Sequence, residues 1–208
     1  MKKTKTKKTG IEGALSTEAT AGDWNRIRDD LVARADREGL IDVAYEMHDS
    51  PFGPLLVGAT ETGLVRVGLS AESEDEVLED LARRLSPRIV RTSRPQITVT
   101  RGQLDEYFAG ERRDFDLELD WQLTRGFRRQ ILQATDHIPY GETRSYTDLA
   151  VEAGSPRAVR AAGTALATNP LPIVVPCHRV LRSDGKVGSY LGGSSMKETL
   201  LDMERTGS

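Results

Sequence analysis

Apolar residues in the first half of the chain recur with two spacings, one helical and one typical of strands. From Asp23 to Glu38, the residues Trp24, Ile27 and Leu31 follow a helical period, which predicts a helix with Asp23 as its N-cap. Short runs at 41–47, 55–59 and 64–69 are separated by glycine- and proline-rich turns, a pattern typical of antiparallel hairpins. Further helices are expected over Ser73 to Leu85 and Thr100 to Ala109.

The pattern changes after residue 117. Residues 117–119 are expected to be extended, and a helical pattern begins at Thr124. A short helix is expected over Ser145 to Ala153. Ser155 then provides an N-cap, followed by Pro156 at the first position of a helix that runs to about Thr168. Two short helices joined by a turn predict a helix-turn-helix, whose second helix enters a DNA groove.

These elements predict an α+β protein in three parts. Residues 1–22 form a disordered basic tail, residues 23–117 an N-terminal α+β domain, and residues 118–208 a C-terminal domain. No segment has the apolar length of a membrane span or of a secretory signal, so a cytoplasmic location without membrane attachment is expected.

The distribution of charge suggests where a nucleic acid would bind. The net charge is -3, yet Ser155 to Arg182 contains four arginines and no acidic residue. The predicted helix in this stretch is rich in alanine and carries Arg157 and Arg160 three positions apart, so a DNA backbone could approach it closely. A solvated surface without acids, or tight packing of the alanines in a core, would give the same pattern.

The single cysteine, Cys177, follows an apolar run and Pro176 and is followed by His178 and Arg179. A thiol reacts as the thiolate, and a neighbouring base or cation promotes its formation. The adjacency therefore indicates a nucleophile beside its base. A buried, unreactive cysteine is the alternative.

Several segments resemble the O6-alkylguanine-DNA alkyltransferase family. The resemblance is strong over about residues 118–205 and weaker over 40–117. It rests on Ile-Pro-Tyr-Gly-Glu-Thr-Arg-Ser-Tyr at 138–146, the helix at 155–168, Asn-Pro at 169–170, Pro-Cys-His-Arg-Val at 176–180 and Gly-Ser-Tyr-Leu-Gly-Gly at 188–193.

The resemblance implies an N-terminal ribonuclease-H-like domain and a C-terminal winged helix-turn-helix-like domain that carries the active site. The family transfers an alkyl group from guanine O6 to its own cysteine in one irreversible turnover, without a cofactor. Cys177 matches the acceptor, His178 the base that acts through a water molecule, and Glu204 the acid that orients the histidine. Tyr146 matches the donor to the leaving guanine, and Asn169 the brace of the active-site turn.

The same resemblance implies a DNA surface and a pocket for a nucleotide rotated out of the duplex. Arg160 matches the residue that fills the gap left by that base. The DNA surface would also include Ser155, Arg157, Ala158, Ala161 and Gly163, and the base pocket Val180, Gly188, Tyr190 and Leu191. The alternatives to these implied roles are a place in the core for Tyr146, a helix C-cap for Asn169 and a phosphate contact for Arg160.

Two departures from the family pattern bear on specificity. Some members have serine at the position of Leu191, so this chain is expected to differ in its tolerance for alkyl size. Some members bind zinc through cysteines and histidines, but one cysteine and three histidines do not support a metal site here.

The expected partner is double-stranded DNA containing O6-alkylguanine, and O4 of alkylated thymine is a second candidate target. The protein is expected to be a monomer in solution that can cluster on DNA. Alternative functions are a protein that binds alkylated DNA without transfer, a helix-turn-helix regulator and a Cys-His hydrolase; the acceptor cysteine and the arginine-bearing stretch disfavour them.

Overall fold

The computed structural model describes residues 21–207, in two units that are treated separately, residues up to 40 and residues 41–207. The first unit contains α1 (Ala21–Arg37), which confirms the helix expected near residue 23. Because α1 begins at Ala21, Asp23 lies in its first turn, and its predicted role as N-cap is wrong. Of the tail predicted over residues 1–22, residues 1–20 lie outside the part of the chain that the structure describes, and the last two residues belong to α1.

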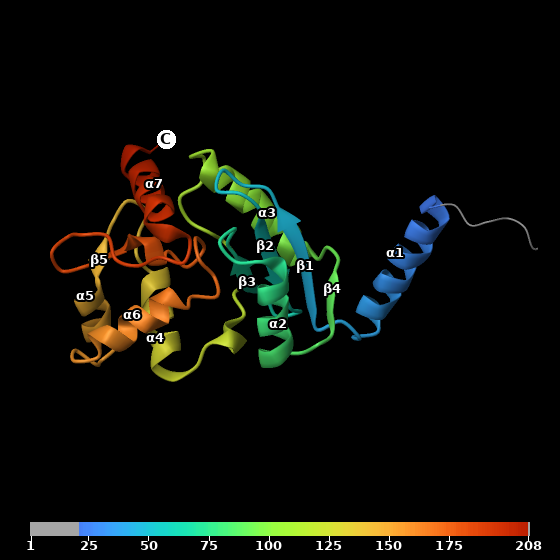
Figure 1. Cartoon of the computed structure of the whole chain (residues 1–208), viewed down its shortest axis with the longest axis horizontal. Coiled ribbons are helices and arrows are strands. Elements are labelled where there is room, and N and C mark those ends of the chain that lie inside the picture. Colours follow the sequence, from blue (N-terminus) through green and yellow to red (C-terminus); the bar gives the residue numbers. More distant parts are fainter. Residues whose placement is uncertain (1–20, 208) are drawn as a thin grey trace, which may run out of the picture. The chain divides into compact units, whose positions relative to one another are not determined.

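The second unit begins with a four-stranded sheet in the order β3-β2-β1-β4 (Figure 1). The three predicted strands are present as an antiparallel meander of β1 (Val43–His48), β2 (Leu55–Ala59) and β3 (Leu64–Gly68). The fourth strand, β4 (Ile89–Arg91), pairs in parallel with β1 and was not predicted, because its three residues are too few to show a period.

Helices cover the two faces of this sheet. On one face, Val43, Tyr45 and Leu56 pack with Val77 and Leu81 of α2 (Glu74–Arg84). Ser73 caps α2 in a capping box with Glu76. The other face packs against α3 (Pro95–Phe108), which begins at Pro95, one turn before the predicted Thr100. The sequence did not indicate this first turn because residues 97–100 are all β-branched, and such residues have a lower helix propensity.

Residues 117–119 are extended, as predicted, and lie along the edge of β3. Leu64 N–H donates to Glu118 O at 2.8 Å and Asp120 N–H to Leu64 O at 2.8 Å. Gly63 allows this approach, since a Cβ there would lie 2.6 Å from the carbonyl carbon of Glu118. The segment therefore attaches to the N-terminal sheet, and the domain boundary at 117/118 stays a prediction.

The C-terminal half is mainly helical. Its elements are η1 (Trp121–Leu123), α4 (Gly126–Asp136), β5 (Arg144–Ser145), α5 (Tyr146–Glu152), α6 (Val159–Ala167), η2 (Cys177–Arg179), β6 (Val180–Leu181) and α7 (Gly193–Thr206). Strands β5 and β6 pair in parallel. One apolar core runs through both halves, from Leu55 and Tyr107 to Ile131 and Leu200, so the halves share their interior. Among residues 21–207, no helix is long and apolar enough to cross a membrane.

The predicted pair of helices is present, but the second begins later than expected. Ser145 caps α5 in a capping box with Asp148. Residues 155–158 form a turn, and the N-cap of α6 is Ala158, so the capping role of Ser155 and the helical position of Pro156 are wrong. Arg157 consequently lies in the turn and not one helical turn before Arg160.

Candidate active site

Cys177 lies at the end of a tight, buried turn. Residues 171–180 are all buried, and Cys177 has 4% of its surface exposed. The apolar run before it is not a strand: Val175 N–H donates to Leu171 O at 2.8 Å, and Cys177 N–H to Val175 O at 2.8 Å. Ile173 adopts a φ of 74°, which is unfavourable for a β-branched residue and persists because its surroundings are closely packed.

The side chain of Asn169 makes three contacts within this turn. Its Nδ2 donates to Val175 O at 2.9 Å and lies 3.2 Å from Cys177 Sγ. Its Oδ1 accepts from Leu171 N–H at 3.0 Å. The helix cap is the neighbouring Thr168, so the alternative of a simple C-cap is wrong for Asn169.

His178 and Glu204 form a buried hydrogen-bonded pair. His178 Nε2 lies 2.9 Å from Glu204 Oε1, with the two side chains 0% and 1% exposed. Because Nε2 faces a carboxylate it carries the proton, which leaves the lone pair on Nδ1. That Nδ1 is buried and has no hydrogen-bond partner among residues 21–207. The imidazole is therefore arranged to accept a proton at Nδ1.

The carboxylate of Glu204 has further partners that the sequence did not reveal. Arg179 donates to it through Nε at 2.9 Å and Nη2 at 2.8 Å. Gly141 N–H donates to Oε2 at 3.3 Å, and the hydroxyl of Tyr107 donates to Oε1 at 2.6 Å. Arg179 stands in the Pro-Cys-His-Arg motif, but nothing in the sequence indicates which acid it pairs with.

A buried ammonium group also lies near the thiol. Lys197 is 0% exposed, and its Nζ donates to Val180 O at 2.5 Å. Val180 is one of the predicted pocket residues, and its carbonyl oxygen is thus already engaged.

These surroundings set the protonation states of the site. Burial raises the pKa of Cys177, although the Asn169 hydrogen bond and the Lys197 charge oppose this. Burial lowers the pKa of His178 against the opposing effect of Glu204. Burial would raise the pKa of Glu204, but hydrogen bonds from His178 and Arg179 outweigh it and bring the value to about 2. At neutral pH the site holds a thiol, a neutral imidazole and a carboxylate.

An open groove of about 860 Å³ lies beside α6. Its lining includes the predicted residues Tyr146, Arg160, Gly163 and Gly188, and also Arg182. The exposed side of α6 carries Arg160 and Ala161, whereas Ala162 and Ala165 are buried. Tight packing therefore accounts for the buried side of α6, and a DNA-facing role for its exposed side stays a prediction.

Other predicted residues lie outside the lining of this groove. Ser155, Arg157 and Ala158 line a separate shallow hollow of about 520 Å³. Leu191 lines another cavity, together with Arg66, Asn169 and Pro170. Tyr190 has a buried hydroxyl without a partner among the described residues, and its ring centroid lies 6.4 Å from that of His178. Within residues 21–207, no cluster of three or more acidic, histidine or cysteine residues is placed to hold a metal ion.

Comparisons with known proteins agree with this arrangement. Residues 43–121 match the ribonuclease-like domain, and residues 126–206 the DNA binding domain, of 6-O-methylguanine DNA methyltransferase. The constitutive methylated-DNA--protein-cysteine methyltransferase of Bacillus subtilis is 39% identical over 162 residues, 77% of this chain and 94% of that protein. The Mycolicibacterium paratuberculosis protein of that name is 52% identical over 103 residues, 50% of this chain and 62% of that one.

Solved structures show the same fold. The crystal structure of Mycobacterium tuberculosis OGT in complex with DNA has 36% sequence identity and a TM-score of 0.68, and it covers 79% of this chain and 94% of that one. The structure of O6-methylguanine-DNA methyltransferase from Pyrococcus kodakaraensis has 26% identity and a TM-score of 0.54, covering 78% and 98%. The chain described here belongs to the O6-alkylguanine-DNA alkyltransferase family, the methylated-DNA-[protein]-cysteine methyltransferases.

Proposed function

We propose that this chain repairs double-stranded DNA by moving a methyl or other alkyl group from guanine O6 to Sγ of Cys177. The observation that carries the proposal is a pair of buried hydrogen bonds at consecutive residues, Asn169 to Cys177 and His178 to Glu204, so that the thiol directly precedes in the chain an imidazole oriented by a carboxylate. These residues supply a nucleophile and a base without any cofactor.

The reaction would proceed by displacement at the alkyl carbon. The thiol proton passes to Nδ1 of His178 through a water molecule, and sulfur attacks the carbon as the bond from carbon to O6 breaks. The leaving guanine needs a proton or a hydrogen bond, for which Tyr146 is proposed. The thioether at Cys177 has no route back to a thiol, so each molecule acts once.

The target carbon is shielded in the duplex, so the nucleotide must leave the stack, at a cost of a few kcal/mol. We assign Arg160, which lines the groove on the exposed side of α6, to the gap left behind. Gly188, Tyr190, Leu191 and the backbone at Val180 are proposed to hold the base. Ser155, Arg157, Ala158, Ala161 and Gly163 are proposed to lie along the DNA.

We further propose a monomer in solution that clusters on DNA, located in the cytoplasm, as expected from the sequence. The division into domains at 117/118 is part of the same proposal. The main alternative, binding of alkylated DNA without transfer, is disfavoured by the intact Cys177, His178 and Glu204.

Intact-mass spectrometry tests the transfer. After incubation with a duplex containing one O6-methylguanine, the protein should gain one methyl group in place of one proton, and peptide mapping should place it on Cys177. The Cys177→Ala variant should bind the same duplex and gain nothing. An unchanged mass for the wild-type protein, or a methyl group on another residue, would overturn the proposal. Parallel incubations with ethyl- and benzylguanine would define the range of alkyl groups.

A further inference from the structure

The hydroxyl of Tyr107 reaches the active-site carboxylate from the N-terminal half of the chain. Tyr107 lies in α3 and is 0% exposed. Its O–H donates to Glu204 Oε1 at 2.6 Å, and its oxygen lies 3.5 Å from His178 Nε2. A residue 97 positions away in the sequence is therefore in direct contact with the pair that would deprotonate Cys177.

Tyr107 contributes a neutral donor to an atom that is otherwise held by charged or ionisable groups. Glu204 Oε1 also accepts from His178 Nε2 at 2.9 Å and from Arg179 Nη2 at 2.8 Å. Burial and the adjacent Glu204 charge raise the pKa of Tyr107, so the phenol keeps its proton. The hydroxyl thus occupies one acceptor position of the carboxylate, and another is used by His178 Nε2.

The position of this hydroxyl is fixed by packing of the ring. The Tyr107 ring centroid lies 5.2 Å from that of Phe115 and 5.6 Å from that of Phe108. Tyr140 meets it edge-on at 6.2 Å, and the Arg179 guanidinium lies 5.7 Å from the centroid of that same Tyr140 ring. A rigid ring carries a hydroxyl with little freedom, as a group that orients a catalytic side chain requires.

We propose that Tyr107 is a positioning residue for alkyl transfer: its hydroxyl holds the Glu204 carboxylate in the orientation that keeps Nδ1 of His178 free to take the thiol proton. The N-terminal half then takes part in the chemistry through this hydroxyl. This inference rests on the proposed function, since it assigns His178 as the base.

The titratable and charged groups around His178 determine how its pKa should change when the Tyr107 hydroxyl is removed. The Glu204 and Lys197 charges act on it from α7 and the Arg179 charge from η2, where the Cys177 thiol is its neighbour in the chain. Tyr107 approaches from α3 and Tyr190 from the segment before α7, both as neutral phenols. Without the Tyr107 hydroxyl, more of the Glu204 charge is available to stabilise the imidazolium. The pKa of His178 then rises.

The test is Tyr107→Phe, which keeps the ring and removes only the hydroxyl. The matched control is Tyr45→Phe, because Tyr45 also donates to a carboxylate, Glu74 Oε1 at 2.8 Å, and lies on the sheet. Single-turnover methyl transfer from an O6-methylguanine duplex is measured between pH 5 and pH 9, with duplex affinity and thermal unfolding measured alongside. Tyr107→Phe should slow transfer by about tenfold to a hundredfold with unchanged duplex affinity, and Tyr45→Phe should react as the wild type does.

The pH profile separates positioning from mere support of the fold. Transfer requires neutral His178, so the acidic limb of the profile should move to higher pH in Tyr107→Phe. A folded Tyr107→Phe with wild-type rate and profile, or with a rate reduced equally at every pH, would overturn the inference. If Tyr107→Phe does not fold, 3-fluorotyrosine incorporated at position 107 alone, whose hydroxyl is a stronger donor, should move the limb to lower pH, and an unmoved limb would overturn the inference. Failure of the wild-type protein to methylate itself would instead reject the proposed function.

Discussion

Asn169 and Cys177 are joined through the side-chain amide of the asparagine, whose Nδ2 lies 3.2 Å from Sγ while it also holds the carbonyl of Val175 at 2.9 Å. One donor group thus fixes the shape of the turn and faces the reacting atom. This hydrogen bond opposes the effect of burial on the pKa of Cys177, because it favours the thiolate.

Asn169→Asp should make Cys177 less reactive. Aspartate keeps an acceptor for Leu171 N–H but removes the donor and places a negative charge beside sulfur, so the pKa of Cys177 rises. The rate of thiol alkylation by iodoacetamide, followed against pH, should shift to higher pH, and methyl transfer at neutral pH should fall by about tenfold. Asn25→Asp makes the same change on α1 and should alter neither. An unshifted alkylation profile in Asn169→Asp would contradict the assignment.

Glu204 makes stability depend on pH in the acidic range. Its pKa is about 2 in the folded protein against an ordinary 4.5, so the unfolded chain binds the proton more tightly. This contribution, about 3 kcal/mol, is fully present above about pH 4.5 and is lost as the pH falls towards 2.

Replacing Glu204 by glutamine should remove that dependence. Urea unfolding at several pH values between 2 and 7 should show a steep loss of stability on acidification for the wild type and a flatter curve for Glu204→Gln. The variant should also be less stable at pH 7, because buried Arg179 loses its ionic partner. Parallel curves for the two proteins would show that another group controls the acid response.

Residues close together in the sequence were predicted well, and contacts between distant residues were not. The strands at 55–59 and 64–69 and the helix over 73–85 all depend on neighbours a few positions apart. Tyr107 and Glu204 are 97 positions apart, and Arg66 and Pro170 are 104 apart, so no local pattern reveals either contact. Ser155-Pro156 has a good local capping pattern, yet α6 starts at Val159. There, tertiary packing outweighs local preference.

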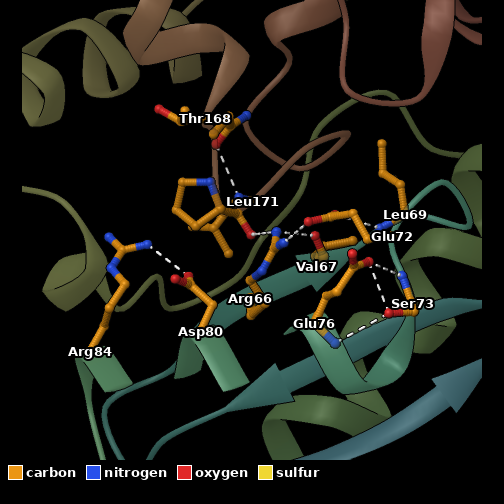
Figure 2. A network of polar contacts seen from close by, with 12 residues as sticks. Arg66, Val67, Leu69, Glu72, Ser73, Glu76, Asp80, Arg84, Thr168 and Leu171 are labelled. Atoms are coloured by element: carbon orange, nitrogen blue, oxygen red, sulfur yellow. Dashed lines mark hydrogen bonds and ion pairs between the residues drawn. The ribbon is translucent and has the colours of Figure 1, made fainter. Parts of the chain in front are cut away.

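Arg66 joins the sheet to the segment beside the active-site turn (Figure 2). Arg66 is 6% exposed, and its guanidinium donates to Val67 O at 2.8 Å and Pro170 O at 3.3 Å and pairs with Glu72. Val67 N–H also donates to Pro170 O, at 2.8 Å. Pro170 stands between Asn169 and Leu171, so this contact supports the brace of the cysteine turn.

Arg66→Met should therefore cost stability and loosen the turn. Glu72 loses its ionic partner and Pro170 O loses one of two donors, which together should lower the free energy of unfolding by about 3 kcal/mol. Amide exchange at Val67 and Leu171 should accelerate. The double variant Arg66→Met/Glu72→Leu should recover part of the stability, since it leaves no unpaired carboxylate. If the double variant is no more stable than the single one, the ion pair is not the origin of the loss.

Gly188 permits the close approach of Tyr146. A Cβ at residue 188 would overlap the Tyr146 hydroxyl and lie 3.1 Å from two carbons of its ring. Gly188→Ala should therefore displace the proposed donor to guanine and slow methyl transfer, while affinity for undamaged DNA stays unchanged. Gly102→Ala is the control, because a Cβ there meets nothing within 4 Å. It should leave transfer intact and stabilise α3 by about 0.5–1 kcal/mol. Equal transfer rates in both variants would argue against a role for Tyr146.

Arg157 and Arg160 should differ in what they contribute to DNA binding. Arg160 lines the groove from α6, whereas Arg157 lies in the preceding turn and lines a separate hollow. Both are exposed. Their different positions predict a phosphate contact for Arg157 and insertion into the duplex for Arg160.

Alanine at each position distinguishes the two roles. Arg157→Ala should weaken binding to damaged and undamaged duplexes alike and reduce the slope of log affinity against log salt by about 0.9, the value for one phosphate contact. Arg160→Ala should instead lower the preference for a duplex with O6-methylguanine. Since no side chain then fills the gap, the damaged base rotates out less often, and the fluorescence of 2-aminopurine placed next to the lesion should fall because its neighbour stays stacked. If both variants lose affinity equally on the two duplexes, Arg160 also acts only through phosphate, and another side chain must hold the gap.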